Sequence, residues 1–264
     1  MLNQHLPLPP TKLQQKILKN TDRHGPFREL STSRCKIMEQ NGPFSPHNIY
    51  SREGIFSALV FRGILFNTDA LQEHVGCGFF ESWDAWKQFV AAHRDKKESY
   101  MCNPHVYGRT NGRSPSNAQH FWIGSEILHK KLLQEPNITF TEIVDFIATA
   151  KGLDKKTLFP TFGILTAYLF TVDLVYAGRA PMPSLEEVAK MVCKLDKGGS
   201  RGLMKIGVAS DSSPKQIARG FIELFHFLDQ DKEFSHIKHQ VIFDPFMLEH
   251  SLCKASRDSW LSFA

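Results

Sequence analysis

The sequence predicts an all-α fold, and two observations predict it. Between breaks rich in Gly and Pro, apolar side chains recur at the three- and four-residue spacing of a helix, and strand patterns are almost absent. Helix-start signals precede several of these segments. The clearest is Ser184, followed three residues later by Glu187, which together predict a capping box.

Length and composition are those of a globular protein. A chain of 264 residues forms one large domain or two small ones, and 42% hydrophobic and 22% charged residues are ordinary values for a folded domain. The net charge of +5 and the pI of about 8.9 fit a nucleic-acid partner without requiring one.

Five cysteines lie far apart, with no CxxC pair, which disfavours a zinc ribbon or a disulfide framework and favours reduced thiols. We therefore expect no metal and no cofactor. Neither a signal peptide nor an apolar run of spanning length is visible, so we expect no membrane association and an intracellular location, nuclear in a eukaryote.

The chain divides near residue 34. Residues 1–34 are polar, basic and interrupted by Pro, and we expect a loosely ordered N-terminal arm. Residues 35–264 are expected to form a single helical domain. Whether the arm lies on this domain or on DNA stays open.

In chain order, apolar periodicity predicts a first core helix at 49–71 that includes Arg62. Ser82 can cap an amphipathic helix ending at His93, and Thr139 or Thr141 can cap the helix expected at 139–151, with Glu142 in its first turn. Gly, Asn and Pro predict a loop at 98–117. The later helices are expected at 124–135, 139–151, 164–176, 184 onward, 215–228 and 243–254.

A hairpin, Phe159-Pro160-Thr161-Phe162-Gly163, precedes the helix at 164–176. Free N–H groups at the start of that helix suit a phosphate oxygen, so Thr161 and Gly163 are candidate DNA-backbone contacts. Alternatively, Pro160 begins a buried helix and Gly163 only relieves crowding.

The helix at 164–176 contains one carboxylate, Asp173, among apolar neighbours. A buried carboxylate must be paired, hydrogen-bonded or held at a raised pKa. Asp173 is therefore a candidate catalytic residue, unless it lies on an exposed stripe or caps a neighbouring element.

A second Gly-rich segment, Lys197-Gly198-Gly199-Ser200-Arg201-Gly202, predicts a flexible basic turn before Lys205. Glycines let a backbone approach a ligand closely, and Lys and Arg add positive charge, so the segment is typical of an anion nest. A solvated loop between helices is the other interpretation.

Three stretches together resemble the alpha-glutamyl/putrescinyl thymine pyrophosphorylase family, which is related to hydroxymethyluracil DNA kinases. They are the Gly163, Ala167-Tyr168 and Asp173-Leu174 positions, then Gly198 with Arg201-Gly202-Leu203 and Lys205, then Ser251-Leu252-Cys253. The chain departs from the family pattern at Thr161, Leu169 and Lys254, where the family has Gly, Gln and an acid.

The resemblance implies a fold of the helix-hairpin-helix DNA glycosylase superfamily. It also implies a reaction in which an amine co-substrate replaces the pyrophosphate on an activated 5-hydroxymethyluracil in DNA. From the residues themselves, the expected catalytic residues for this reaction are Asp173, Arg201 and Lys205. Asp173, if its apolar helix raises its pKa, acts as a general base on the amine or stabilises a cationic transition state, and Arg201 and Lys205 hold the pyrophosphate.

The same hypothesis assigns phosphate contacts to Lys197, Gly198, Gly199, Gly202 and Arg62. Arg62 is otherwise simply an exposed or paired Arg.

Tyr168 is expected to stack on an extruded base. The alternatives are a glycosylase-like base-excision enzyme, without lyase chemistry because Ile164 stands where such enzymes have Lys, and an inactive DNA-binding relative.

Overall fold

The structure is a computed structural model that describes residues 11–103, 112–153 and 155–257, and within these ranges it contains helices and no strand. This confirms the all-α prediction. The helices of the N-terminal half are α1 Lys12–Lys19, α2 Thr21–His24, the 3-10 turn η1 Arg28–Leu30, α3 Thr32–Ile37, α4 Arg52–Val60, the π-helical turn η2 Phe61–Leu65, α5 Asp69–Glu73, α6 Trp83–Ala92, α7 Glu98–Met101, the 3-10 turn η3 Pro115–Asn117 and α8 Ala118–Gln134. Those that follow are α9 Phe140–Thr149, α10 Ile164–Tyr176, α11 Leu185–Leu195, α12 Gly198–Lys205, α13 Pro214–Gln230, α14 Ser235–Val241 and α15 Pro245–Ala255.

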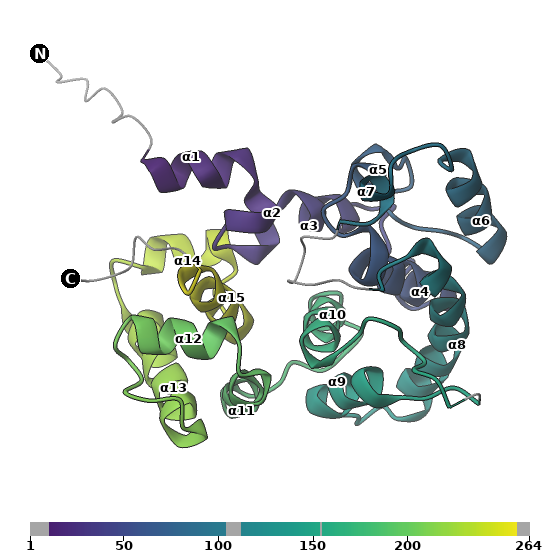
Figure 1. Cartoon of the computed structure of the whole chain (residues 1–264). Coiled ribbons are helices and arrows are strands. Elements are labelled where there is room, and N and C mark those ends of the chain that lie inside the picture. The colour runs from purple at the N-terminus through teal and green to yellow at the C-terminus, as the bar shows by residue number, and fades with distance from the viewer. Residues whose placement is uncertain (1–10, 104–111, 154, 258–264) are drawn as a thin grey trace, which may run out of the picture.

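The helices form two groups joined across the top by α1 to α3 (Figure 1). In one group α4 packs on α8 and α9 on α10, and in the other α12 packs on α15 and α11 on α13. Buried apolar side chains from both groups belong to one continuous core. The site described below lies where α10, α15 and the N-terminal segment meet.

Several helices begin where the sequence predicts. Ser82 caps α6 by accepting from Ala85, and Thr139 forms a full capping box with Glu142 at α9. At α11 the box is only half formed, because the Glu187 carboxylate accepts from Thr141 of α9 instead of returning to Ser184. The Glu187 side chain, predicted to complete a capping box, therefore links α11 to α9.

The predicted helix at 49–71 is broken. It runs as α4, widens into η2, and then turns at Asn67, whose φ of 55° is left-handed, before α5. π-helical turns are rare and cluster at functional sites. Here the wide turn presents Arg62 to the interior.

The loop predicted at 98–117 contains two short helices, α7 and η3, and its residues 104–111 lie outside the description. The expected loose arm also differs from the structure: residues 11–34 form α1, α2, η1 and the start of α3, and both Arg28 and Arg34 are buried. Among the helices described, none is both long and apolar enough to cross a bilayer.

Candidate functional site

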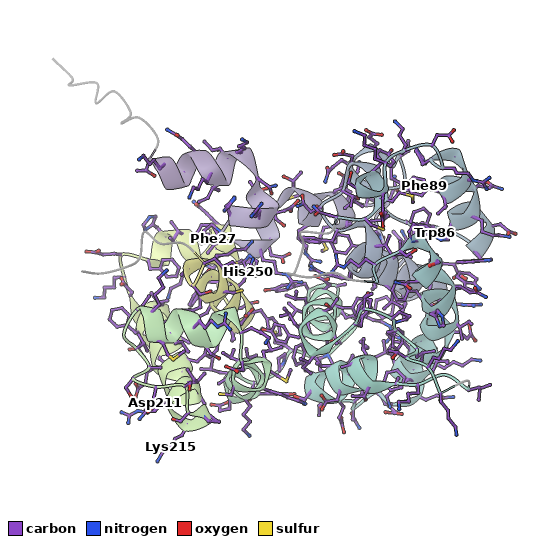
Figure 2. All side chains as sticks on the ribbon, in the orientation of Figure 1. Phe27, Trp86, Phe89, Asp211, Lys215 and His250 are labelled. Carbon is purple, nitrogen blue, oxygen red and sulfur yellow. The ribbon has the colours of Figure 1, made fainter. Side chains whose placement is uncertain are left out.

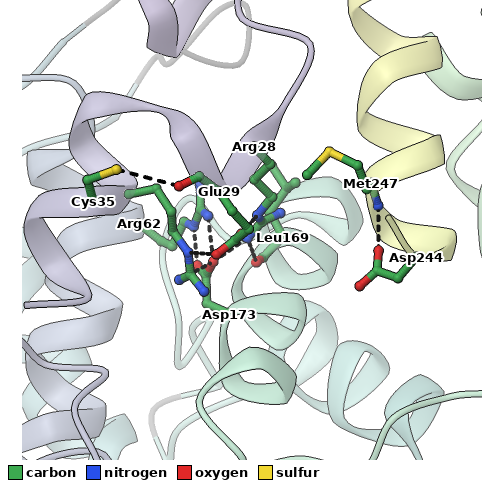
Figure 3. A network of polar contacts seen from close by, with 9 residues as sticks. Arg28, Glu29, Cys35, Arg62, Leu169, Asp173, Asp244 and Met247 are labelled. Atoms are coloured by element: carbon green, nitrogen blue, oxygen red, sulfur yellow. Dashed lines mark hydrogen bonds and ion pairs between the residues drawn. The ribbon is translucent and has the colours of Figure 1, made fainter. Parts of the chain in front are cut away.

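Asp173 lies at the centre of a buried ion-pair cluster. Its carboxylate is fully buried on α10 and accepts hydrogen bonds from Arg28, Arg34 and Arg62 (Figure 3). Arg34 Nη1 is 3.0 Å from Oδ1, and Arg62 Nη2 is 2.7 Å from the same oxygen. Asp173 is therefore paired, which is one of the alternatives that its apolar surroundings predicted.

The described part of the cluster contains more arginines than acids. Glu29 is its second acid, with Oε2 2.8 Å from Nε of Arg34 and Oε1 3.6 Å from Nε of Arg28. Among the residues described, three guanidinium groups thus meet two carboxylates. Guanidinium groups beside a cavity favour an anion there.

The pKa of Asp173 corrects one expectation. Burial alone would raise it, but the guanidinium groups of Arg28, Arg62 and Arg34 outweigh burial and lower the pKa to about 2. The prediction of a raised pKa is wrong. A carboxylate this acidic, with its oxygens engaged by three arginines, is a poor proton acceptor near neutral pH.

A cavity of about 320 Å³ opens beside the cluster. Its lining includes Arg28, Arg34 and Arg62, and Leu165 and Leu169 of α10 form an apolar part of the wall. The other basic side chains on its lining are Arg23, Lys254 and Arg257. The cavity is thus strongly basic, with an apolar surface on α10 against which a flat ring could pack.

Arg34 has a buried donor directed at no protein atom. The side chain is 1% exposed, and its Nη2 has no hydrogen-bond partner among the residues described. Its guanidinium carbon lies 5.3 Å from the Phe44 ring centroid and 5.5 Å from that of Tyr176, so aromatic faces hold it in place. A fixed, unsatisfied N–H on a cavity lining is typical of a ligand contact.

α15 also lines the cavity, through Glu249, His250 and Cys253. His250 faces the segment that contains Phe27 (Figure 2), and burial lowers the pKa of its imidazole well below the usual value. Burial raises the pKa of the Cys253 thiol, which does not favour a nucleophilic thiolate.

Lys254, where the resembled family has an acid, fastens the N-terminal segment to α15. Its Nζ donates to the carbonyl oxygens of Asp22, at 2.8 Å, and Arg23, at 2.9 Å. The last carbonyls of α2 suit a cation. This contact keeps the segment that contributes Arg28 and Arg34 against the cavity.

The Gly-rich segment is a helix and not the predicted turn. Gly198, Gly199 and Gly202 lie in α12 and face α15. A Cβ on Gly198 would meet Cys253 Sγ at 2.3 Å, and one on Gly202 would meet the Leu252 carbonyl oxygen at 2.4 Å. These glycines let two helices pack closely, and none lines the cavity.

The basic residues of that segment also lie away from the cavity lining. Lys197 and Arg201 are exposed, and Lys205 Nζ donates to the Ala255 carbonyl oxygen at 3.2 Å. The structure therefore does not bring Lys197, Arg201 and Lys205 together with Asp173 around one cavity. They lie on or beside the α12 surface.

The hairpin before α10 has the predicted form. Thr161 adopts a left-handed φ of 71°, and its hydroxyl has no hydrogen-bond partner in the described part of the chain. Gly163 is the exposed cap of α10, with no side-chain cap, and a Cβ there would meet nothing within 4 Å. The first N–H groups of α10 are thus open to an approaching group.

Tyr168 occupies the core. Its ring makes edge contacts with Phe140 and Phe246, its side chain is 1% exposed, and it does not line the cavity. The expectation that Tyr168 stacks on a base does not fit this position. Within the residues described, no cluster of three or more His, Cys, Asp or Glu has the arrangement of a metal site.

Sequence reasoning missed Arg28, Arg34 and Glu249 as site residues. The arginines belong to a segment expected to be loose, and they reach Asp173 across 145 and 139 residues of chain. The only available signal was indirect: a carboxylate in an apolar helix requires partners. Comparison with family models, with curated proteins and with solved structures finds no match to this chain.

Proposed function

We propose that this protein is a DNA base-modifying enzyme of the helix-hairpin-helix type, in which the arginine-lined cavity holds the phosphate groups of an activated base. The observation that supports this most is the buried, unpartnered Nη2 of Arg34 on a basic cavity. Arginine forks match phosphate oxygens in both geometry and charge.

The start of α10 offers a second phosphate contact. Gly163 exposes the free N–H groups of a helix beginning, and Leu165, one turn into the same helix, lines the cavity. A DNA backbone at Gly163 would place an extruded nucleotide near the cavity mouth. Leu165 and Leu169 would then pack against its ring.

Under this proposal Asp173 is a positioning residue. It orients Arg28, Arg34 and Arg62 through short charge-assisted hydrogen bonds and takes no proton itself. The exposed Lys197 and Arg201 would contact DNA outside the cavity. The reaction is replacement of a pyrophosphate on 5-hydroxymethyluracil by an amine.

A second candidate, a non-catalytic DNA-binding relative, is favoured by the engagement of Asp173 with three arginines. The same observation counts against base excision, which would need Asp173 as the catalytic acid or base. Lys254 adds to this alternative, since its structural contact to α2 replaces the family's acid.

The test is incubation of the protein with DNA containing pyrophosphorylated 5-hydroxymethyluracil, with putrescine or glutamate as the amine. We expect pyrophosphate release and a modified nucleoside detected by mass spectrometry. Arg34→Lys, which keeps the charge but removes the Nη2 fork, should lower the rate by ~10²-fold. Arg219→Lys, on an exposed pair with Glu223, is the matched control.

Each candidate has its own result in this assay. Abasic sites without amine transfer would indicate base excision. Salt-sensitive DNA binding with no product would support the non-catalytic relative. If DNA does not bind even at low salt, the whole proposal fails.

A further inference from the structure

Glu249 is an acid without a partner on a basic cavity. It lies on α15, is 5% exposed and lines the cavity. Its carboxylate receives no hydrogen bond and forms no ion pair within the described part of the chain. Every other acid at this site is engaged: Asp173 and Glu29 by arginines, and Asp22 by the backbone N–H and hydroxyl of Ser33.

The position of Glu249 is fixed by close packing. Gly199 of α12 leaves the space that the side chain fills, since a Cβ on Gly199 would lie 3.3 Å from Oε1. Leu248 and Leu252, its neighbours on α15, are buried in the core. Glu249 therefore lines the cavity from a fixed position on α15, with its Oε1 close to α12, and a proton-exchanging group requires such a fixed position.

We propose that Glu249 is the proton-exchanging residue of this cavity, so that anion binding there is coupled to proton uptake by its carboxylate. An ionised Glu249 repels an anion held by the arginines, and a protonated one does not. Its neutral form can also donate a hydrogen bond to the anion.

The charged and titratable groups around Glu249 bear on whether another residue could take this role. Burial raises its pKa from 4.5 to about 7, with Arg28 and Arg257 opposing the rise. The groups facing it are Arg28 from η1, Tyr168 from α10, and Cys253 and Arg257 from α15 and its end. The remaining charged or titratable groups on the cavity are Asp22, Arg23, Arg34, Arg62, His250 and Lys254.

Three other groups near Glu249 have a shifted pKa. Burial raises the pKa of Tyr168 and of Cys253 above their ordinary values, and it lowers the pKa of His250 below its ordinary value. Of the described groups around the cavity with a shifted pKa, Glu249 is the one whose pKa lies between 6 and 8.

In the amine transfer, and resting on the proposed function, a Glu249 that is neutral while the pyrophosphate is bound serves as the proton donor. The lone pair of the neutral amine forms a C–N bond at the 5-methylene carbon. The C–O bond breaks, and its electron pair stays on the departing pyrophosphate, which is held by the arginines and takes the proton of Glu249. The proton lost by nitrogen then passes to the Glu249 carboxylate and restores its neutral form.

The test is isothermal titration calorimetry with sulfate, which stays a dianion from pH 6 to 8. In the wild-type chain we expect sulfate affinity to fall by ~3- to 10-fold across this range, since one repulsive charge near an anion is of this size. Titration at pH 7 in buffers of different ionisation enthalpy should show proton uptake on binding.

Glu249→Gln should bind sulfate with a flat pH profile and without proton uptake. Glu233→Gln, which removes an exposed acid from another part of the chain, should behave as the wild type. A thermal melt of each variant checks folding, and carbon-13 NMR of labelled Glu in the wild type follows the Glu249 carboxyl directly.

Retained proton uptake in Glu249→Gln, a carboxyl signal that titrates below pH 5, or no sulfate binding at any pH would each overturn the proposal. Sulfate binding needs no DNA, so it can succeed when amine transfer fails. Conversely, amine transfer that survives Glu249→Gln rejects the proton-donor role and leaves the proposed function standing.

Discussion

At the scale of single residues, the site is a balance of buried charges. Asp173 and Glu29 form ion pairs with Arg28, Arg34 and Arg62 and hold them in fixed positions. Glu249 also lines the cavity but forms no ion pair within the described part of the chain. The pKa of Asp173 is lowered and that of Glu249 is raised, and this difference assigns the roles of these two carboxylates.

Replacing Asp173 with Asn tests the structural role of the cluster. The change leaves three buried guanidinium groups without their shared acid, so we expect a loss of ~3–5 kcal/mol in the free energy of unfolding. Urea denaturation measures it. Asp145→Asn, which removes an exposed pair with Lys194, should cost ~1 kcal/mol or less. Equal losses in the two variants would show that the cluster is not stabilising.

The raised pKa of Glu249 predicts a pH-dependent stability. An acid whose pKa is raised by folding stabilises the protein below its unfolded value of 4.5, and this contribution is lost as pH rises through about 7. Between pH 5 and 8, Glu249→Gln should therefore gain about 3 kcal/mol relative to the wild type.

Asp173 does not interfere in this window. Its lowered pKa gives stability that is present above 3.8 and lost as pH falls through about 2. Urea unfolding of both chains at the two pH values is the measurement. A constant difference would mean that Glu249 is ionised throughout.

At the scale of elements, close packing against α12 holds α15, which lines the cavity, in position. Gly202→Ala would place a methyl group 2.4 Å from the Leu252 carbonyl oxygen, a contact that only backbone movement relieves. We expect a loss of ~1–3 kcal/mol in the free energy of unfolding. Gly163→Ala, where a Cβ meets nothing within 4 Å, is the control and should change stability by less than ~1 kcal/mol. A neutral Gly202→Ala would contradict this packing role.

The hairpin before α10 contains a residue in an unfavourable conformation. Thr161 has a φ of 71°, which β-branched residues rarely adopt and glycine adopts freely. Thr161→Gly should stabilise the protein by up to ~1 kcal/mol. The backbone strain that it relieves in the folded state is larger than the conformational entropy that glycine adds to the unfolded chain. Thr157→Gly, at a residue whose φ is not positive, should instead destabilise. Thermal unfolding of both variants decides between them.

At the scale of the whole molecule, the N-terminal segment completes the site. Arg28 and Arg34 come from elements that lie between the two helix groups, and Lys254 and Ser251 of α15 hold nearby backbone through the carbonyls of Asp22, Arg23 and Pro26. The cavity therefore depends on the position of this segment as much as on α10.

Lys254→Met should loosen that segment while leaving α10 in place. We expect amide hydrogen exchange in residues 21–34 to accelerate by ~10-fold or more, because two charge-assisted hydrogen bonds to the end of α2 are lost. Lys238→Met, which removes a contact to the Asp229 backbone on α13, is the control and should leave residues 21–34 unchanged. Unchanged exchange in both variants would mean that other contacts hold the segment.

The sequence by itself determined the helical class, the bounds of α10, the caps of α6 and α9, and the hairpin ending at Gly163. These features depend on local hydrophobic periodicity and on capping side chains that accept hydrogen bonds from backbone N–H groups a few residues away. It also showed that Asp173 needed a partner.

The tertiary structure decided which partners Asp173 has, and with them the sign of its pKa shift. The helical form of 198–202 was likewise a matter of packing, since those glycines are used against α15 and not in a turn. Ion pairs between residues more than a hundred positions apart produce no pattern in a sequence. A buried acid indicates that its partner is a basic residue, but it does not indicate where in the chain that residue lies. That is why the arginine cavity and Glu249 emerged only from the folded chain.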